Sequence, residues 1–142
     1  MTVFQGSAVA VITPFGESGR KVDYDAYGKI IDWLIDEGSD ALVTCGTTGE
    51  ASTLTWDEQI ATIEFAVKRV GGKVPVIAGV GANATEEAIE GSKRAEAVGA
   101  DALLHVTPYY NKCSRRGLIE HFTVCAASVK IPVILYSVPS RT

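Results

Sequence analysis

Residues 74–106 read VPVIAGVGANATEEAIEGSKRAEAVGADALLHV and contain one complete structural repeat. Two short apolar runs, 74–78 and 102–106, flank a segment with apolar or small residues at helical spacing. Runs of this kind, bounded by Gly, Pro or Asp, are typical of strands buried on both faces of a parallel sheet. We expect Thr85 to cap the intervening helix and Gly99 to end it, which predicts a strand–helix–strand unit.

The same alternation extends in both directions along the chain. Further apolar runs occupy 8–12, 41–45 and 132–136, so strand starts recur about every 30 residues, the length of one β–α unit. Asp23, Thr55 and Ser114 are the predicted caps of three more helices, and Thr55 with Glu58 forms a capping box. The repeat predicts an α/β fold, either a barrel or an open doubly wound sheet.

Length and composition limit the classes of protein. The chain has 142 residues, and 13 basic against 17 acidic side chains give a net charge of 13 − 17 = −4. One domain is expected, the acidic balance argues against a nucleic-acid partner, and no apolar run is long enough to span a membrane. We find no secretory signal in the first residues and expect a cytoplasmic protein with reduced cysteines.

The cysteines and histidines give no metal motif. The spacing of Cys45, Cys113 and Cys125 matches no known ligand pattern, and Cys45 and Cys125 lie in apolar segments as small core residues. His105 and His121 are few and far apart in sequence, so no metal site is predicted.

Candidate functional residues follow the predicted strands. In parallel α/β folds the working side chains lie at the carboxyl ends of the strands. These ends carry Gly-Thr-Thr-Gly at 46–49, Tyr110 in the segment 107–111, Tyr136, and Arg141. Two glycines with adjacent hydroxyls and free N–H groups can hold a small carboxylate, tyrosines can relay protons, and an arginine can bind a second carboxylate. The alternatives are a tight turn, rim tyrosines and a surface arginine.

Four motifs resemble the dihydrodipicolinate synthase (4-hydroxy-tetrahydrodipicolinate synthase) family. They are Gly-Thr-Thr-Gly-Glu at 46–50, Val-Ile-Ala-Gly-Val-Gly-Ala-Asn at 76–83, Thr-Pro-Tyr-Tyr-Asn at 107–111 and Ile-Leu-Tyr-Ser-Val-Pro-Ser-Arg-Thr at 134–142. They occur in the family's order with natural spacing over the whole chain.

The resemblance implies a TIM (β/α)8 barrel, of which residues 1–142 would form the N-terminal portion with about five parallel strands and four helices. It implies a lyase of lysine (diaminopimelate) biosynthesis that condenses pyruvate with aspartate 4-semialdehyde through a Schiff base. No metal or organic cofactor is implied, and the family's partners are its substrates and copies of itself, as homodimers or homotetramers.

The resemblance also implies residue roles. Thr47 and Thr48 correspond to the loop that binds the pyruvate carboxylate, and Thr47 would link Tyr136 and Tyr110 in a proton relay. Tyr136 would be the main acid/base group, Tyr110 would reach a neighbouring subunit, and Arg141 would bind the semialdehyde carboxylate.

Asn83, Glu87 and Tyr109 match a lysine-effector site of some members. Trp56 and Gln59 stand where regulated members often carry histidines, so lysine control does not follow.

The Schiff-base lysine is not among the positions that match. The chain stops at Thr142 before the strand that would carry it, and the lysines present read as helix or turn positions. An inactive truncated fragment is therefore one alternative to the synthase. A separate alternative is another pyruvate-dependent aldolase, like N-acetylneuraminate lyase. A partial barrel would also expose sheet edges and an apolar inner face, so we expect the chain to self-associate.

Overall fold

The computed structural model describes residues 2–142, in which strands and helices alternate. The elements are β1 (Ala8–Ala10), α1 (Tyr24–Asp36), β2 (Ala41–Thr44), the short 3-10 helix η1 (Ala51–Thr53), α2 (Trp56–Val70), β3 (Val76–Gly79), α3 (Thr85–Ala97), β4 (Ala102–Val106), α4 (Arg115–Ala127) and β5 (Val133–Tyr136). Within this part of the chain, none of the helices has the length and apolar character that crossing a bilayer requires.

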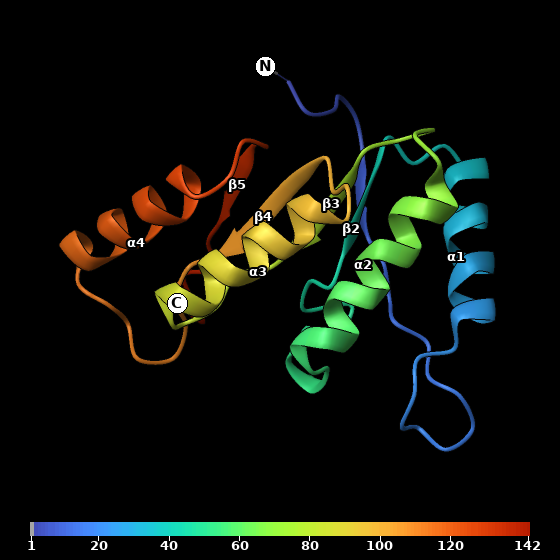
Figure 1. Cartoon of the computed structure of the whole chain (residues 1–142), viewed down its shortest axis with the longest axis horizontal. Coiled ribbons are helices and arrows are strands. Elements are labelled where there is room, and N and C mark those ends of the chain that lie inside the picture. Colours follow the sequence, from blue (N-terminus) through green and yellow to red (C-terminus); the bar gives the residue numbers. More distant parts are fainter. Residues whose placement is uncertain (1) are drawn as a thin grey trace.

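The five strands form one parallel sheet in the sequential order β1-β2-β3-β4-β5. Figure 1 shows the helices gathered on one side of this sheet. A doubly wound sheet has a non-sequential strand order and helices on both faces, so that alternative is excluded. Sequential parallel strands with helices outside are the arrangement of a β/α barrel, which confirms that prediction.

Three predicted helix starts are confirmed by their capping hydrogen bonds. Asp23 Oδ1 accepts from the Ala26 N–H at 2.9 Å, and Ser114 Oγ accepts from the Gly117 N–H at 3.1 Å. In the capping box, the Glu58 N–H donates to Thr55 Oγ1 at 3.3 Å and the Thr55 N–H donates to Glu58 Oε2 at 2.8 Å. These bonds satisfy N–H groups that the first turn of a helix leaves free.

The predicted cap of α3 is wrong. Helix α3 begins at Thr85 itself, and the residue before it, Ala84, makes no side-chain capping bond. The Thr85 hydroxyl lies instead 2.9 Å from Nδ1 of His121 on α4. The Thr85 hydroxyl therefore contacts a residue far away in sequence instead of capping the helix, and the local sequence does not reveal this partner.

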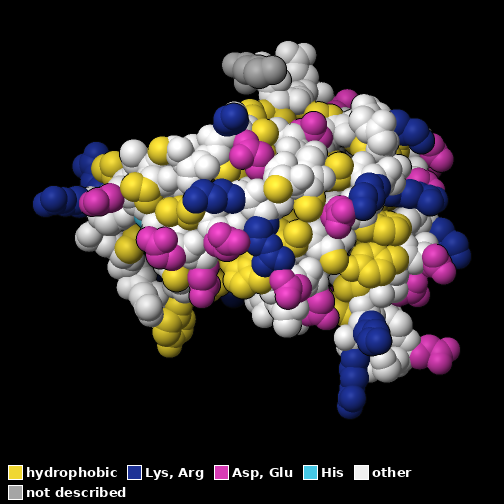
Figure 2. All heavy atoms as spheres, in the orientation of Figure 1, with side chains coloured by type: hydrophobic (Ala, Val, Ile, Leu, Met, Phe, Trp, Pro, Cys, Tyr) yellow, Lys and Arg dark blue, Asp and Glu magenta, His cyan; other side chains and the backbone are white. Residues whose placement is uncertain are grey.

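The main core lies between the sheet and the helices. Leu42, Ile63 and Leu103 are fully buried there, in clusters that join β2, β3 and β4 to α1, α2 and α3. A smaller cluster around Ala41, Ile77 and Ala102 lies on the other face of the sheet, because successive strand residues alternate between faces. On the surface seen in Figure 2, acidic and basic side chains are interspersed without a field of one sign.

Candidate functional site

The loop at 46–49 is held against two neighbouring strand ends. A side chain on Gly79 would place its Cβ 2.4 Å from the carbonyl oxygen of Cys45, and one on Gly49 would lie 3.0 Å from that of Val11. The buried Thr13 hydroxyl donates to the Gly49 carbonyl at 2.7 Å. The loop can therefore approach the ends of β1 and β3 this closely only because Gly79 and Gly49 lack side chains. The sequence analysis did not assign Gly79 or Thr13 a part in positioning the loop.

Backbone strain surrounds this loop and a second one. Among residues 2–142, the non-glycine residues with left-handed φ are Cys45 (53°), Glu50 (53°), Tyr110 (70°) and Lys112 (48°). The first two bracket the 46–49 loop, and the other two lie in the loop after β4. Each such conformation costs on the order of 1–3 kcal/mol and persists where the surroundings enforce it, often at ligand sites.

The threonines of the first loop are free to meet a ligand. Thr47 and Thr48 are both exposed, and the Thr47 carbonyl accepts from the Glu50 N–H at 3.0 Å, which closes the turn. Burial raises the pKa of the neighbouring Cys45 thiol to about 12, so this thiol stays protonated and unreactive at neutral pH. The loop thus offers hydroxyl groups and no reactive thiol.

The second loop joins the end of β5. The Thr107 N–H donates to the Tyr136 carbonyl at 2.8 Å, and the Tyr110 N–H donates to the Arg141 carbonyl at 3.4 Å. Tyr136 shares a face of β5 with Ile134, which packs on the inner side of the sheet. Tyr136 also lines a groove between this edge and α4, together with Thr107, Phe122 and Pro139.

The proton relay is not joined by direct hydrogen bonds. Within residues 2–142, none links the hydroxyls of Thr47, Tyr110 and Tyr136. The Tyr110 side chain is 90% exposed, and Arg141 is exposed with no acidic partner among the described ion pairs. The fold places these residues at the carboxyl ends of β2, β4 and β5 and leaves Tyr110 exposed to solvent.

The predicted effector residues are partly assembled. Asn83 Oδ1 accepts from the Tyr109 N–H at 2.7 Å, so the ends of β3 and β4 are tied together here. Glu87 lies exposed in the first turn of α3.

No lysine occupies a nucleophile position. Every lysine of the chain is exposed, and all lie in helices, turns or loops and none in a strand. This agrees with the prediction that the lysines present are solvated side chains.

The expectation that the histidines are isolated is wrong. Strand β4 and helix α4 bring a ring nitrogen of His105, a ring nitrogen of His121 and the Cys125 sulfur within 4.8 Å of one another, and all three residues are buried. Burial, with the nearby His121, lowers the pKa of His105 to about 4. Residues 16 and 20 positions apart share no local motif, so only the fold reveals this cluster.

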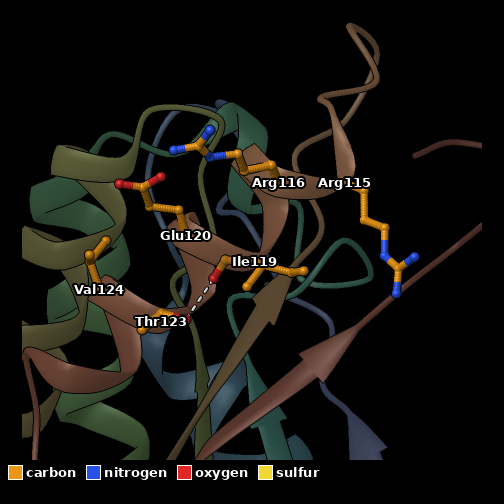
Figure 3. Close-up of a pocket in the computed structure, with 6 residues that line it drawn as sticks. All are labelled: Arg115, Arg116, Ile119, Glu120, Thr123 and Val124. Atoms are coloured by element: carbon orange, nitrogen blue, oxygen red, sulfur yellow. Dashed lines mark hydrogen bonds between the residues drawn. The ribbon is translucent and has the colours of Figure 1, made fainter.

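A further hollow on the surface does not qualify as a site. It runs along the outer side of α4 and is lined by residues of that helix alone, including Arg116, Glu120 and Val124 (Figure 3). Figure 3 shows these side chains spreading outward rather than converging on one point. A ligand site needs enclosing walls and convergent polar groups, which one helix face does not supply.

Comparison with known proteins identifies the family of this chain. Residues 3–142 match the model of the dihydrodipicolinate synthetase family. The 4-hydroxy-tetrahydrodipicolinate synthase of Thermoanaerobacter sp. (strain X514) is 55% identical over 142 residues, which are 100% of this chain and 47% of that protein.

Solved structures give the same result. The crystal structure of dihydrodipicolinate synthase from Aquifex aeolicus superposes with a TM-score of 0.94 at 55% identity, covering 98% of this chain and 47% of that one. The Acinetobacter baumannii enzyme, solved in complex with pyruvate, gives 0.95 at 47% identity, with 99% and 48% covered. The chain spans about half the length of the curated relatives it matches, and its five parallel strands form part of a barrel like theirs. This chain belongs to the dihydrodipicolinate synthetase family.

Proposed function

We propose that this chain supplies the pyruvate-binding and acid/base half of a 4-hydroxy-tetrahydrodipicolinate synthase, which condenses pyruvate with aspartate 4-semialdehyde in lysine biosynthesis. The observation that carries the proposal is the 46–49 loop, which is strained at both ends and seated on Gly79. A relative of 47% identity is described in complex with pyruvate, and the loop's exposed hydroxyls suit a carboxylate of that size.

Each candidate residue has a role in this proposal. Thr47 and Thr48 bind the pyruvate carboxylate through hydroxyl and backbone N–H groups. Tyr136, with Thr47 and Tyr110, moves protons at the reacting carbon and nitrogen, and a ligand or a neighbouring chain completes the contacts that these hydroxyls lack here. Arg141 receives the semialdehyde carboxylate through its guanidinium. The resemblance implies that the N-acetylneuraminate lyase branch usually lacks an arginine here, so Arg141 favours the semialdehyde as substrate.

Pyruvate binding to the chain tests the loop. Titration followed by NMR should shift the amide signals of residues 46–50, and Thr48→Val should abolish these shifts while the fold persists. Thr123→Val, an equally exposed threonine on α4, is the matched control and should bind as the parent does. Equal binding by the Thr48 variant would remove the carboxylate role.

The Schiff-base step separates the synthase from the inactive-fragment alternative. A lysine amine and the pyruvate ketone lose one water to form an imine, which borohydride reduces to a stable amine detectable by mass spectrometry. Because every lysine is exposed and none lies in a strand, we expect no specific adduct on the chain alone. A stoichiometric adduct on one lysine would show that the chain forms the intermediate by itself.

We also propose that the chain self-associates. Ile12, Leu135 and Tyr136 are 53%, 58% and 43% exposed on the inner side and edge of the sheet, where apolar side chains and unpaired backbone groups meet solvent. Light scattering at micromolar concentration should give a mass above that of one chain, whereas a stable monomer would contradict the proposal.

A further proposal concerns lysine as an effector. Asn83, Glu87 and Tyr109 lie near the ends of β3 and β4 and offer an amide, a carboxylate and a phenol to an amino acid. Calorimetry with lysine tests this, with Glu87→Gln expected to weaken binding.

A further inference from the structure

The buried cluster between β4, α3 and α4 is separate from the residues at the strand ends. His105 lies on β4 and packs beneath α3, while His121 and Cys125 are one turn apart on α4 and face the same way. All three side chains are buried, at 0%, 6% and 0% exposure. One nitrogen of each imidazole and the thiol sulfur lie within 4.8 Å of one another.

The hydrogen bonds of His105 fix which of its nitrogens is free. The Ser92 hydroxyl donates its single proton to the Ala88 carbonyl, so it can only accept from His105 Nε2, which lies 2.9 Å away. Nε2 therefore carries the ring proton, and Nδ1 is left with a lone pair. Among the described residues, Nδ1 of His105 is buried and has no hydrogen-bond partner.

His121 repeats this arrangement. Its Nδ1 lies 2.9 Å from the Thr85 hydroxyl, and its Nε2 is buried without a partner within residues 2–142. Leaving a buried polar atom unpaired costs about 1–3 kcal/mol, so two such atoms beside a buried thiol require an explanation. In metal sites, the second nitrogen of a ligating histidine is held by an outer hydrogen bond, as Ser92 and Thr85 do here.

We propose that His105 Nδ1, His121 Nε2 and Cys125 Sγ bind one Zn²⁺ ion. Imidazole and thiolate are the ligands that Zn²⁺ prefers, and three protein ligands leave the fourth tetrahedral position to water. Binding releases the thiol proton to solvent and leaves a thiolate on the metal. The three atoms now lie within 4.8 Å of one another and would approach more closely around the ion.

The site would act as a structural clamp. His121 and Cys125 are the buried residues of α4, so the metal would join this helix to β4 through side chains that already face the core. No other histidine exists in the chain, and Cys113 is exposed in the loop before α4. Adventitious binding by surface carboxylates or Cys113 is therefore separable by substitution.

The test uses the 142-residue chain after removal of metal with a chelator. Titration with Co²⁺ as a spectroscopic probe should give the visible bands of a tetrahedral site and a sulfur-to-cobalt charge-transfer band, which one equivalent of Zn²⁺ removes. Cys125→Ala should abolish the charge-transfer band, and Cys113→Ser should retain it. Thr85→Val and Ser92→Ala should weaken binding about 10–100-fold by freeing the ligating rings.

Circular dichroism of each variant establishes that it is folded before binding is compared. A folded parent chain that binds no Co²⁺ or Zn²⁺ would overturn the proposal, as would equal binding by the Cys125 variant. If that variant fails to fold, Thr85→Val decides the matter, because it keeps all three ligands and the side-chain shape. Unchanged affinity in Thr85→Val would then count against the site.

Discussion

Helices α2 and α4 cover the same sheet, but they are attached to it by different chemistry. Helix α2 buries Ile60, Ile63, Ala66 and Val70, whereas α4 buries His121 and Cys125 and leaves Ile119 58% exposed. Figure 1 shows α2 lying over the sheet beside α1 and α3, while α4 stands at the end of the row. Apolar burial stabilises the first helix. The second buries less apolar surface: Cys125 packs in a small cluster with Ala82 and Ala88, and His121 lies within hydrogen-bonding distance of Thr85.

The largest expected effect concerns the apolar packing of α2. Ile63 is fully buried in the main core, so Ile63→Ala should lower the free energy of unfolding by about 2–5 kcal/mol through lost burial and a cavity. Ile119→Ala on α4 is the matched control and should change it by less than about 0.5 kcal/mol. Urea denaturation followed by circular dichroism measures both, and equal losses would show that α4 is packed as tightly as α2.

The next effect concerns the close packing beneath the 46–49 loop. Gly79→Ala should destabilise the chain by about 1–3 kcal/mol, because its Cβ would meet the Cys45 backbone at 2.4 Å. It should also displace the loop and weaken pyruvate binding. In Gly46→Ala the nearest atom to the new Cβ is 3.8 Å away on Val43, so stability should change little. Similar stabilities for the two variants would mean that the loop does not depend on this contact.

Most of the fold followed from local patterns, and the exceptions share one cause. The five strands, the caps at Asp23, Thr55 and Ser114 and the strand-end loops are encoded in adjacent residues, and the structure contains all of them. Strand β1 ends two residues earlier than predicted, and β3 begins two residues later. The role of Thr85 depends on His121, a residue 36 positions away. In the same way, the proximity of His105 to Cys125 depends on how α4 packs. Single-sequence periodicity carries no information about such partners.

The candidate site likewise has features that the local sequence predicts and features that it does not. Thr47, Tyr110, Tyr136 and Arg141 were found because each follows an apolar run, a local signal. The left-handed backbone of Cys45 and Glu50 could not be predicted, since neither residue favours that conformation and only the fit onto β1 and β3 enforces it. Strain of this kind is a property of the folded chain.

A smaller effect compares the helix caps. Thr55→Ala should cost about 1 kcal/mol and more than Ser114→Ala, because it also removes a partner of Glu58, and α4 has Gly117 at the matching position. Thermal unfolding of the two variants measures the difference. A greater loss at Ser114 would indicate that α4 depends on its cap more than on its buried cluster.

The smallest effect is a pH dependence that comes from the capping box of α2. Hydrogen bonds from the Thr55 backbone and hydroxyl hold the pKa of Glu58 below its ordinary value. A carboxyl whose pKa is lower in the folded than in the unfolded state stabilises the fold above the unfolded pKa, and this contribution is lost as the pH falls through the folded pKa. Glu58→Gln should therefore flatten the fall in stability between about pH 5 and pH 3.

The control is Glu120→Gln. Glu120 is an exposed carboxylate on α4 with no hydrogen bond among the described residues, so its substitution should leave the dependence of stability on pH as in the parent chain. Because Glu58 is only half-buried, solvent limits the size of the change, so urea midpoints at the two pH values must be compared within one series. If the Glu58 variant keeps the full acid dependence of the parent, the carboxylate of the capping box contributes nothing that a neutral amide cannot, and the caps of the two helices are equivalent.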